Sequence, residues 1–321
     1  MTEPIDKDPV HMPPVGPAVH ESTSAGGLPP QVIKAVPVRH YGRWISAVLV
    51  LGVLALIGVA FSNADINWSV IPDYLFFDTI VDGAANTLLI TVLSMVIGVA
   101  LGVVLAVMRL SKNPVTSAVA RMYIYLFRGT PVLVQLFLWY NIALIFPILN
   151  LGFYKNEMTD VMTPFLAALL GLGLNEAAYM AEICRAGIQS VDGGQIEASH
   201  ALGLTGAQTM RRIVLPQAMR VIVPPTGNEF VNMLKTSSLA YGIQYQELLK
   251  AATDISSRTL AVMEMLFVAS VWYLLLTSVF SIGQYYLERR FARGATRNLP
   301  PTLLQKVGAS LTRLSHREGV A

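Results

Sequence analysis

Residues 83–108 read GAANTLLITVLSMVIGVALGVVLAVM and contain no charged side chain. A helix that crosses a bilayer needs about 20 consecutive, predominantly apolar residues, so this run is long enough to span. The whole chain of 321 residues is 54% hydrophobic and only 13% charged. Soluble domains carry about 25% charged residues. The composition therefore excludes a water-soluble globular protein and predicts an all-α integral membrane protein.

Similar apolar runs recur along the chain, and together they predict about six transmembrane helices. We expect these helices at 45–62, 83–108, 129–147, 163–184, 219–242 and 264–287. The fifth is the least regular, because Pro224, Pro225, Gly227, Glu229 and Lys235 interrupt it.

The basic residues predict how these helices are oriented. With the N-terminus in the cytoplasm, 18 of the 23 lysines and arginines fall on inside segments. The outside loop 63–82 carries four aspartates and no base. This bias is what the positive-inside rule expects, so we expect both termini in the cytoplasm. Without the fifth helix, the base-rich C-terminal tail would lie outside.

The segments that flank the helices are polar. Residues 1–43 hold eight prolines and no apolar run, which predicts a disordered cytoplasmic tail without a signal peptide. We expect a second cytoplasmic tail at 288–321. The single cysteine, Cys184, excludes an internal disulfide, and the five scattered histidines indicate no metal site. No lysine follows a glycine, so the chain has no phosphate-binding loop for ATP.

The inside loop 185–218 carries the clearest local signals. Residues 194–202 favour a short helix that Gly203 would end. Thr205 and Gln208 have the spacing of a capping box, which predicts a second short helix ending or kinking at Pro216. A structured inside loop in a chain without an ATP site indicates a docking surface for a partner. From the residues alone, a hairpin that lies on or re-enters the membrane is an equal alternative.

A resemblance favours docking. The stretch EASHALGLTGAQTMRRIVLP, 197–216, resembles the EAA loop of ATP-binding cassette (ABC) importer permeases. Glu197, Ala198, Gly203, Ile213, Leu215 and Pro216 fall on places of that motif, with Ser199 in place of its second alanine. Further segments resemble the polar amino acid branch of the family: NTLLITVLSMVIGVALGVVLAVMRLS (86–111), FRGTPVLVQLF (127–137), AYMAEICRAGI (178–188) and LPQAMRVIVPP (215–225). Two places depart from it, Val191-Asp192-Gly193 and Thr236.

The resemblance implies a type I importer subunit in the cell membrane, whose permease domain covers 83–287. Two permease subunits, identical or sibling, would form the pathway for an amino acid. Two ATPase subunits, which would bind ATP and magnesium, would dock on the EAA loops, and an external binding protein would deliver the cargo. The family core has five helices, so the helix within 44–64 resembles an added N-terminal anchor.

Small and polar residues of the second helix share one face. Thr87, Thr91 and Ser94 follow helical spacing, and Ser94, Gly98 and Gly102 continue it in steps of four. Close helix packing is the favoured interpretation, and contact with cargo is the alternative.

Arg128 precedes Gly129, Thr130 and Pro131 at the expected start of the third helix. Thr130 would cap that helix, and Pro131 would occupy its first turn. Arg128 is equally a candidate for an inter-subunit salt bridge or a gate.

Charged groups inside a membrane need partners or water. Glu182 can pair with Arg185 on one helix, although it remains a pathway candidate. Glu229 and Lys235 are about 120° apart on a regular helix, so they should not pair directly. A broken helix that carries ionisable groups is typical of transport sites, so Glu229 and Lys235 are the leading pathway candidates. Glu176 also needs a partner.

Two other function classes compete with an importer permease. A secondary transporter or channel should show two similar halves, and no such self-similarity is evident. An intramembrane enzyme would need a metal-binding or nucleophile–base pattern, and none is evident either.

Overall fold

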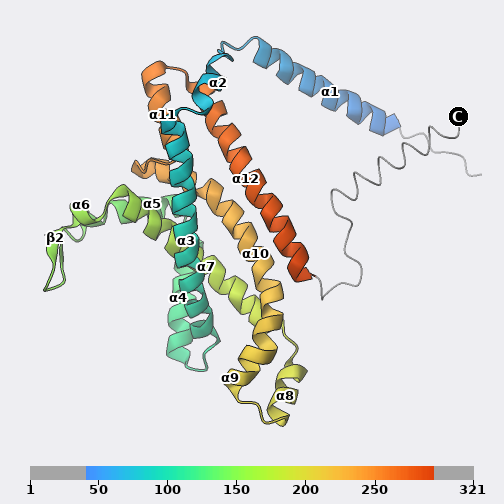
Figure 1. The fold of residues 1–321 in the computed structure, drawn as a ribbon, viewed down its shortest axis with the longest axis vertical. Helices are drawn as coiled ribbons and strands as arrows, with labels where there is room; N and C mark the ends of the chain where they lie inside the picture. Colours follow the sequence, from blue (N-terminus) through green and yellow to red (C-terminus); the bar gives the residue numbers. More distant parts are fainter. Residues whose placement is uncertain (1–40, 293–321) are drawn as a thin grey trace, which may run out of the picture. The chain divides into compact units, whose positions relative to one another are not determined.

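The computed structural model describes residues 41–292, and the chain divides into two units at Ala64. Most of the expected tail 1–43, and the part of the expected tail 288–321 after Ala292, lie outside the described residues. The first unit contains the helix α1 (Tyr41–Ser62) (Figure 1). Its segment Trp44–Ser62 is long and apolar enough to cross a membrane. Its described side chains are all exposed, and a helix that is apolar on every side suits a lipid environment.

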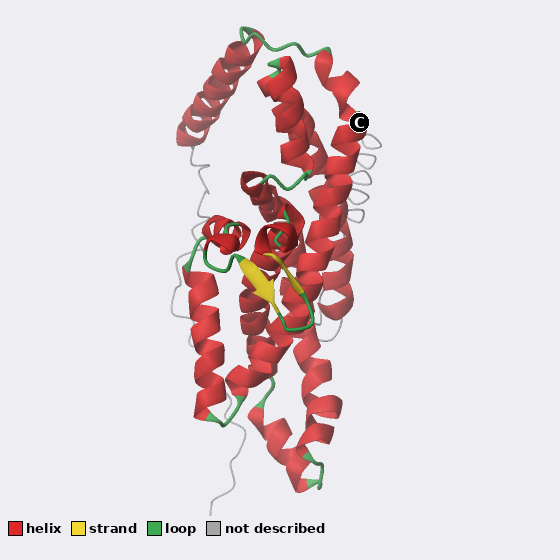
Figure 2. Ribbon diagram, turned by 90° about the vertical axis from the view of Figure 1, so that its left-hand side faces the viewer, coloured by secondary structure: helices red, strands yellow, loops and turns green. Residues whose placement is uncertain are grey.

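The second unit is built from helices and one small hairpin. Its longer helices are α3 (Asp78–Leu110), α4 (Pro114–Gly129), α5 (Val132–Tyr140), α7 (Pro164–Gln189), α8 (Gly193–Ala201), α10 (Leu215–Thr236), α11 (Leu248–Thr259) and α12 (Val262–Ala292). Its short helical elements are α2 (Val70–Leu75), η1 (Ile142–Leu144), α6 (Met158–Val161), α9 (Gly206–Thr209), the π-helical turn η2 (Met210–Val214) and η3 (Ser237–Ile243). The hairpin, seen in Figure 2, pairs β1 (Ile148–Asn150) antiparallel with β2 (Lys155–Glu157).

Four of the expected transmembrane helices meet the length and hydropathy of a membrane span within the described residues. They are Trp44–Ser62, Asp78–Leu110, Pro164–Gln189 and Val262–Phe291. The sequence marks the start of the third of these, because Thr163 Oγ1 accepts a hydrogen bond from Leu166 N at 3.3 Å and Pro164 occupies the first turn.

The expected helix 129–147 is wrong. The chain is helical from Pro114 to Gly129 and again from Val132 to Tyr140. Thr130 has ψ 144°, because a residue before proline is pushed out of the helical region. Thr130 does not cap α5 either; its Oγ1 donates to Leu126 O at 2.8 Å and so closes α4. The FRGTP segment therefore joins two helices instead of starting one.

The fifth expected helix forms as α10, with two differences. It begins at Leu215 and ends at Thr236, after which η3 follows. The expected break at Pro224 and Pro225 is absent, since α10 is continuous through both prolines.

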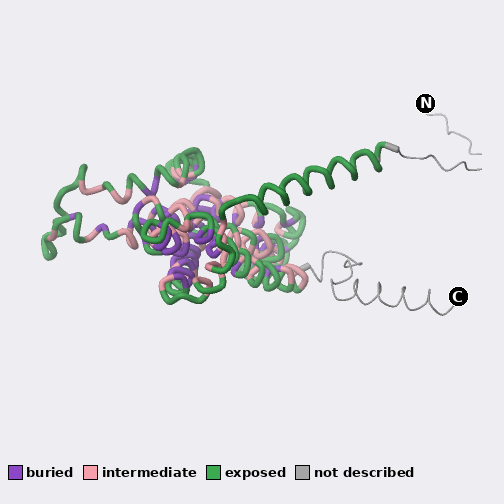
Figure 3. The backbone as a smooth tube through the Cα atoms, turned by 90° about the horizontal axis from the view of Figure 1, so that it is seen from above, coloured by how far each residue is buried: buried purple, intermediate pink, exposed green. Residues whose placement is uncertain are grey.

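At the centre of the second unit, α3 packs against α7 (Figure 1). Figure 3 colours each residue by its burial and shows the buried residues inside the group of helices. A Cβ on Gly98 would lie 2.5 Å from Glu176 Cγ, and one on Gly102 would lie 2.5 Å from Met180 Cβ. The small residues of α3 thus allow close helix packing, as expected.

Two groups of connecting segments lie at opposite ends of the second unit. α8, α9 and the α3–α4 turn lie at one end, and α2 and α11 lie at the other (Figure 1). The α3–α4 turn, α8 and α9, which are expected in the cytoplasm, thus lie at the end opposite α2 and α11, which are expected outside; the β1–β2 hairpin lies between the two ends.

Candidate functional site

The first candidate site is the α8–α9 loop, residues 192–216, which joins α7 to α10. α8 agrees with the expected helix 194–202. Asp192 caps it, because its Oδ1 accepts a hydrogen bond from Gly194 N at 2.8 Å. Asp192, where the chain departs from the amino acid permease pattern, is therefore the N-cap of α8.

Gly203 ends α8 as expected. Its φ is +77°, a left-handed conformation in which any Cβ is strained. Gly203 N donates to His200 O at 2.9 Å, and Leu204 N donates to Ser199 O at 3.1 Å. These two bonds form a Schellman turn, which satisfies the last carbonyl groups of α8.

The capping box at α9 is also present. Thr205 N donates to Gln208 Oε1 at 2.9 Å, and Gln208 N donates to Thr205 Oγ1 at 3.4 Å. The expected end of the helix at Pro216 is wrong, because the backbone stays helical from Gly206 to Thr236. The π turn η2 lies directly before this proline, which has no N–H to donate, and both features are known causes of the alternative that was expected, a kink.

The α8–α9 loop presents apolar and acidic side chains to its surroundings. Glu197, Ala198 and Pro216 are exposed, and Ile213 is half-buried. Leu202, in the turn, has 82% of its surface exposed. An apolar residue held outward on a rigid turn favours contact with another macromolecule.

The hidden side of this loop is braced by residues that the sequence analysis missed. Ile196 packs against a cluster that includes Val191 and Val214. Ser199 is only 3% exposed, and its hydroxyl lies 2.8 Å from Thr209 Oγ1. The sequence signal that could have identified this pair was the serine in place of the motif's second alanine, followed ten residues later by a threonine.

A second brace ties α8 to α10. Gln217 Nε2 donates to Gln195 Oε1 at 2.6 Å and to Ile213 O at 2.9 Å. The bond between Gln195 and Gln217 therefore joins α8 to the first turn of α10.

The second candidate site is the polar cavity, a hollow of about 820 Å³ between the α4–α5 junction, α7 and α10. Three of the four predicted pathway residues, Arg128, Glu229 and Lys235, line it together with Asn175, Glu176 and Tyr179. Its volume is in the usual range for small-molecule sites, about 300–1,000 Å³.

The charges in the polar cavity are not paired with each other. Within residues 41–292, neither Arg128, Glu229 nor Lys235 makes an ion pair, in agreement with the expectation that Glu229 and Lys235 do not meet. The Arg128 guanidinium carbon lies 5.1 Å from the centre of the Tyr179 ring, within cation–π distance.

Glu182 lies outside the polar cavity. Its carboxylate pairs with Arg185 at 2.8 Å on α7, as expected, and also with Arg109 of α3. The second partner was not expected. Glu182 therefore joins two helices, and the structure does not bring it together with the other pathway candidates.

The side-chain amides of Gln135 and Asn175 form hydrogen bonds at the break between α4 and α5. The sequence analysis did not identify either residue. Gln135 Nε2 donates to Phe127 O at 2.9 Å and to Thr130 Oγ1 at 2.8 Å. Asn175 Nδ2 donates to the same Phe127 O at 2.8 Å and to Gln135 Oε1 at 3.1 Å. These bonds satisfy a carbonyl that the break exposes, and they fix Arg128 beside the cavity.

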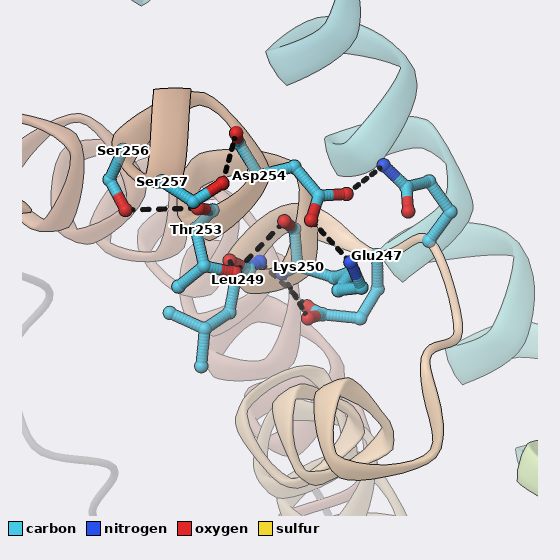
Figure 4. A network of polar contacts seen from close by, with 8 residues as sticks. Glu247, Leu249, Lys250, Thr253, Asp254, Ser256 and Ser257 are labelled. Atoms are coloured by element: carbon cyan, nitrogen blue, oxygen red, sulfur yellow. Dashed lines mark hydrogen bonds and ion pairs between the residues drawn. The ribbon is translucent and has the colours of Figure 1, made fainter. Parts of the chain in front are cut away.

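The opposite end of the unit contains a polar network that stabilises structure (Figure 4). Glu247 is fully buried and caps α11, since it accepts hydrogen bonds from Leu249 N at 2.9 Å and Lys250 N at 2.7 Å. The Tyr273 hydroxyl donates to Glu247 Oε2 at 2.6 Å. Burial raises the pKa of Glu247, although these three hydrogen bonds act in the opposite direction. Lys250 also pairs with Asp254.

Comparison with known families matches residues 98–293 to the binding-protein-dependent transport system inner membrane component. The arginine transport system permease protein ArgU of Corynebacterium glutamicum is 47% identical over 284 residues, which cover 88% of this chain and 90% of that protein. The L-cystine transport system permease protein TcyB of Bacillus subtilis is 35% identical and covers 68% of this chain and 88% of its own length.

Solved structures give the same result for the fold. The crystal structure of an amino acid ABC transporter with histidines superposes with a TM-score of 0.62 at 36% identity, over 71% of this chain and all of that one. A chain of the MetNI methionine ABC transporter, in an inward-facing conformation, superposes with a TM-score of 0.52 at 18% identity, over 66% of this chain and 95% of that one.

Proposed function

The chain belongs to the family of inner-membrane components of binding-protein-dependent transport systems, and we propose that it forms the membrane pathway of an importer for an amino acid. It is a permease subunit of an ABC importer, not an enzyme. In this proposal, ATP and magnesium bind to separate ATPase subunits, and the α8–α9 loop receives the force that they generate.

The geometry of the α8–α9 loop is the observation that carries this proposal. Leu202 and Glu197 are exposed on one side, and Ser199 and Thr209 bond to each other on the hidden side. A surface that is exposed to a partner but braced against the membrane helices can transmit movement in both directions. A hairpin buried in lipid would place the exposed carboxylate of Glu197 in an apolar environment, which is costly.

An amino acid cargo is supported by the relatives and by the polar cavity. Two permeases that are similar to this chain carry names of arginine and L-cystine transport. The cavity holds bases, Arg128 and Lys235, that suit an α-carboxylate, and an acid, Glu229, that suits an α-ammonium group.

The partners follow from the same family. We propose that a second permease subunit, identical or sibling, faces the polar cavity, that two ATPase subunits dock on the α8–α9 loops, and that an external binding protein delivers the cargo. The permease domain would cover 83–287, and the helix within 44–64 would be an N-terminal anchor.

We also propose that both termini lie in the cytoplasm. The expected outside loop 63–82 contains the exposed Ser69. Its replacement, Ser69→Cys, should react with a membrane-impermeant thiol reagent added to intact cells. Protection of this position until the membrane is opened would reverse the topology.

The central experiment is co-purification with candidate ABC ATPase subunits of the same organism, followed by reconstitution in vesicles. We expect a stable complex whose ATP hydrolysis rises when the amino-acid-loaded binding protein is added. Uptake that follows an ion gradient without ATP would contradict the proposal and would favour a secondary transporter.

A further inference from the structure

Glu176 is the most deeply placed charged residue of the polar cavity, and its surroundings do not neutralise it. The side chain lines the cavity, yet only 4% of the residue's surface is exposed. Its atom Oε1 is buried without a hydrogen-bond partner within residues 41–292. A buried carboxylate oxygen without a partner is costly, above all in the charged form, so Oε1 needs a hydrogen-bond donor that a bound ligand could supply.

From this geometry we propose that Glu176 is the counter-charge for a cationic side chain of the transported amino acid, which makes this permease selective for cationic cargo. The inference rests on the proposed function and names the substrate class of the same site. A guanidinium or ammonium group would supply both the charge and the hydrogen bonds that the carboxylate lacks.

The order of charges with depth supports this orientation of the cargo. Arg128 and Lys235 are exposed, Glu229 is half-buried, and Glu176 is buried. The bases therefore lie at the rim and the acids lie deeper. An amino acid that places its α-carboxylate at the rim brings its side chain toward Glu176, where a positive charge is stabilised and a negative one is repelled.

The position of Glu176 is fixed by packing. Its Cβ and Cγ lie against Gly98 of α3, where an added Cβ would come within 2.5 Å of Glu176 Cγ. The Cβ and Cγ of Glu176 are thus packed at the α3–α7 contact. Neither Arg128 nor Lys235 forms an ion pair with it among the described residues.

The test measures ligand binding to the purified permease–ATPase complex without the binding protein, because the binding protein imposes its own selectivity. The probes are radiolabelled L-arginine and L-citrulline, which has nearly the same shape but a neutral side chain. We expect the unmodified complex to prefer L-arginine by at least about tenfold and the isosteric Glu176→Gln variant to lose this preference. The control Glu157→Gln, which neutralises an exposed carboxylate in β2, should keep it.

Three outcomes separate the inference from the proposed function. If Glu176→Gln still prefers L-arginine as the unmodified complex does, or if the unmodified complex binds both probes equally, the role of Glu176 is overturned. In both cases, hydrolysis stimulated by a loaded binding protein would leave the importer proposal intact. If no amino acid stimulates hydrolysis with any candidate binding protein of the same organism, both the proposed function and this inference fall.

Discussion

The α8–α9 loop and the polar cavity are assembled in different ways. The loop is formed by residues close in sequence, and each of its bonds joins groups about ten residues apart or fewer, apart from the brace between Gln195 and Gln217. The cavity brings together the end of α4 with α7 and α10, which are separated by many residues along the chain. The first is a rigid surface, and the second is a hollow with unpaired charges.

This difference indicates how the two sites should respond to mutation. A rigid surface fails when its backbone is distorted, because the partner then meets the wrong shape. A cavity with unpaired charges fails when a charge is removed, and its surroundings remain folded.

Gly203→Asp should abolish transport. An aspartate in the left-handed conformation of Gly203 is strained by about 1 kcal/mol or more, and its charge lies beside the exposed Leu202. We expect hydrolysis stimulated by the binding protein to fall to the unstimulated level in reconstituted vesicles.

Gly152→Asp is the matched control. Gly152 also has a left-handed φ, +82°, and equally open surroundings, but it lies in the β1–β2 hairpin. This variant should keep stimulated hydrolysis. If Gly203→Asp, present at normal abundance in the membrane, behaves like Gly152→Asp, the α8–α9 loop is not the coupling surface.

Lys235→Ala and Glu229→Ala should impair uptake without preventing assembly. Each removes one charged group from the polar cavity, and a hydrogen bond to a charged group contributes about 1.5–3 kcal/mol, so we expect uptake to fall by about tenfold or more. The ATPase should still co-purify with both variants.

Lys155→Ala and Glu157→Ala remove the same types of charge from the exposed β2 strand and should transport normally. Wild-type uptake by both cavity variants would show that the cargo passes elsewhere.

Ser199→Ala should lower the stability of the complex and should affect transport less than the variants above. It leaves the buried Thr209 hydroxyl without its partner, which costs about 1–3 kcal/mol. The double variant Ser199→Ala with Thr209→Val removes both hydroxyls and should recover most of the lost stability. The measurement is thermal unfolding of the purified complex, and equal losses in the single and double variants would mean that the bond does not brace the loop.

The sequence predicted the loop better than the cavity for a physical reason. Helix caps, a capping box and a glycine turn are local, so Gly203, Thr205 and Gln208 could be assigned from spacing alone. The wrong assignments arose where local rules compete with context. Pro216 was expected to end a helix, but the backbone stays helical there, and α10 is continuous through Pro224 and Pro225.

The polar cavity was only partly predictable. Arg128, Glu229 and Lys235 were identified as charges that a membrane segment must explain, but their meeting depends on which helix faces pack together. For the same reason the sequence did not show that Glu182 lies apart from these three residues, since its partner Arg109 belongs to another helix, α3. The wrong third helix has the same origin, since the hydropathy of 129–147 does not reveal that α4 begins at Pro114.

Cross-linking from two matched leucines tests most directly which end of the molecule meets the ATPase. Leu202 and Leu260 are 82% and 85% exposed, while the native Cys184 is buried. The two leucines directly follow α8 and α11, which lie at opposite ends of the second unit (Figure 1). With Leu202→Cys and Leu260→Cys variants carrying a photoreactive thiol reagent, the account predicts a cross-link to the ATPase subunit from Leu202→Cys alone. A cross-link to the ATPase from Leu260→Cys and none from Leu202→Cys would contradict it.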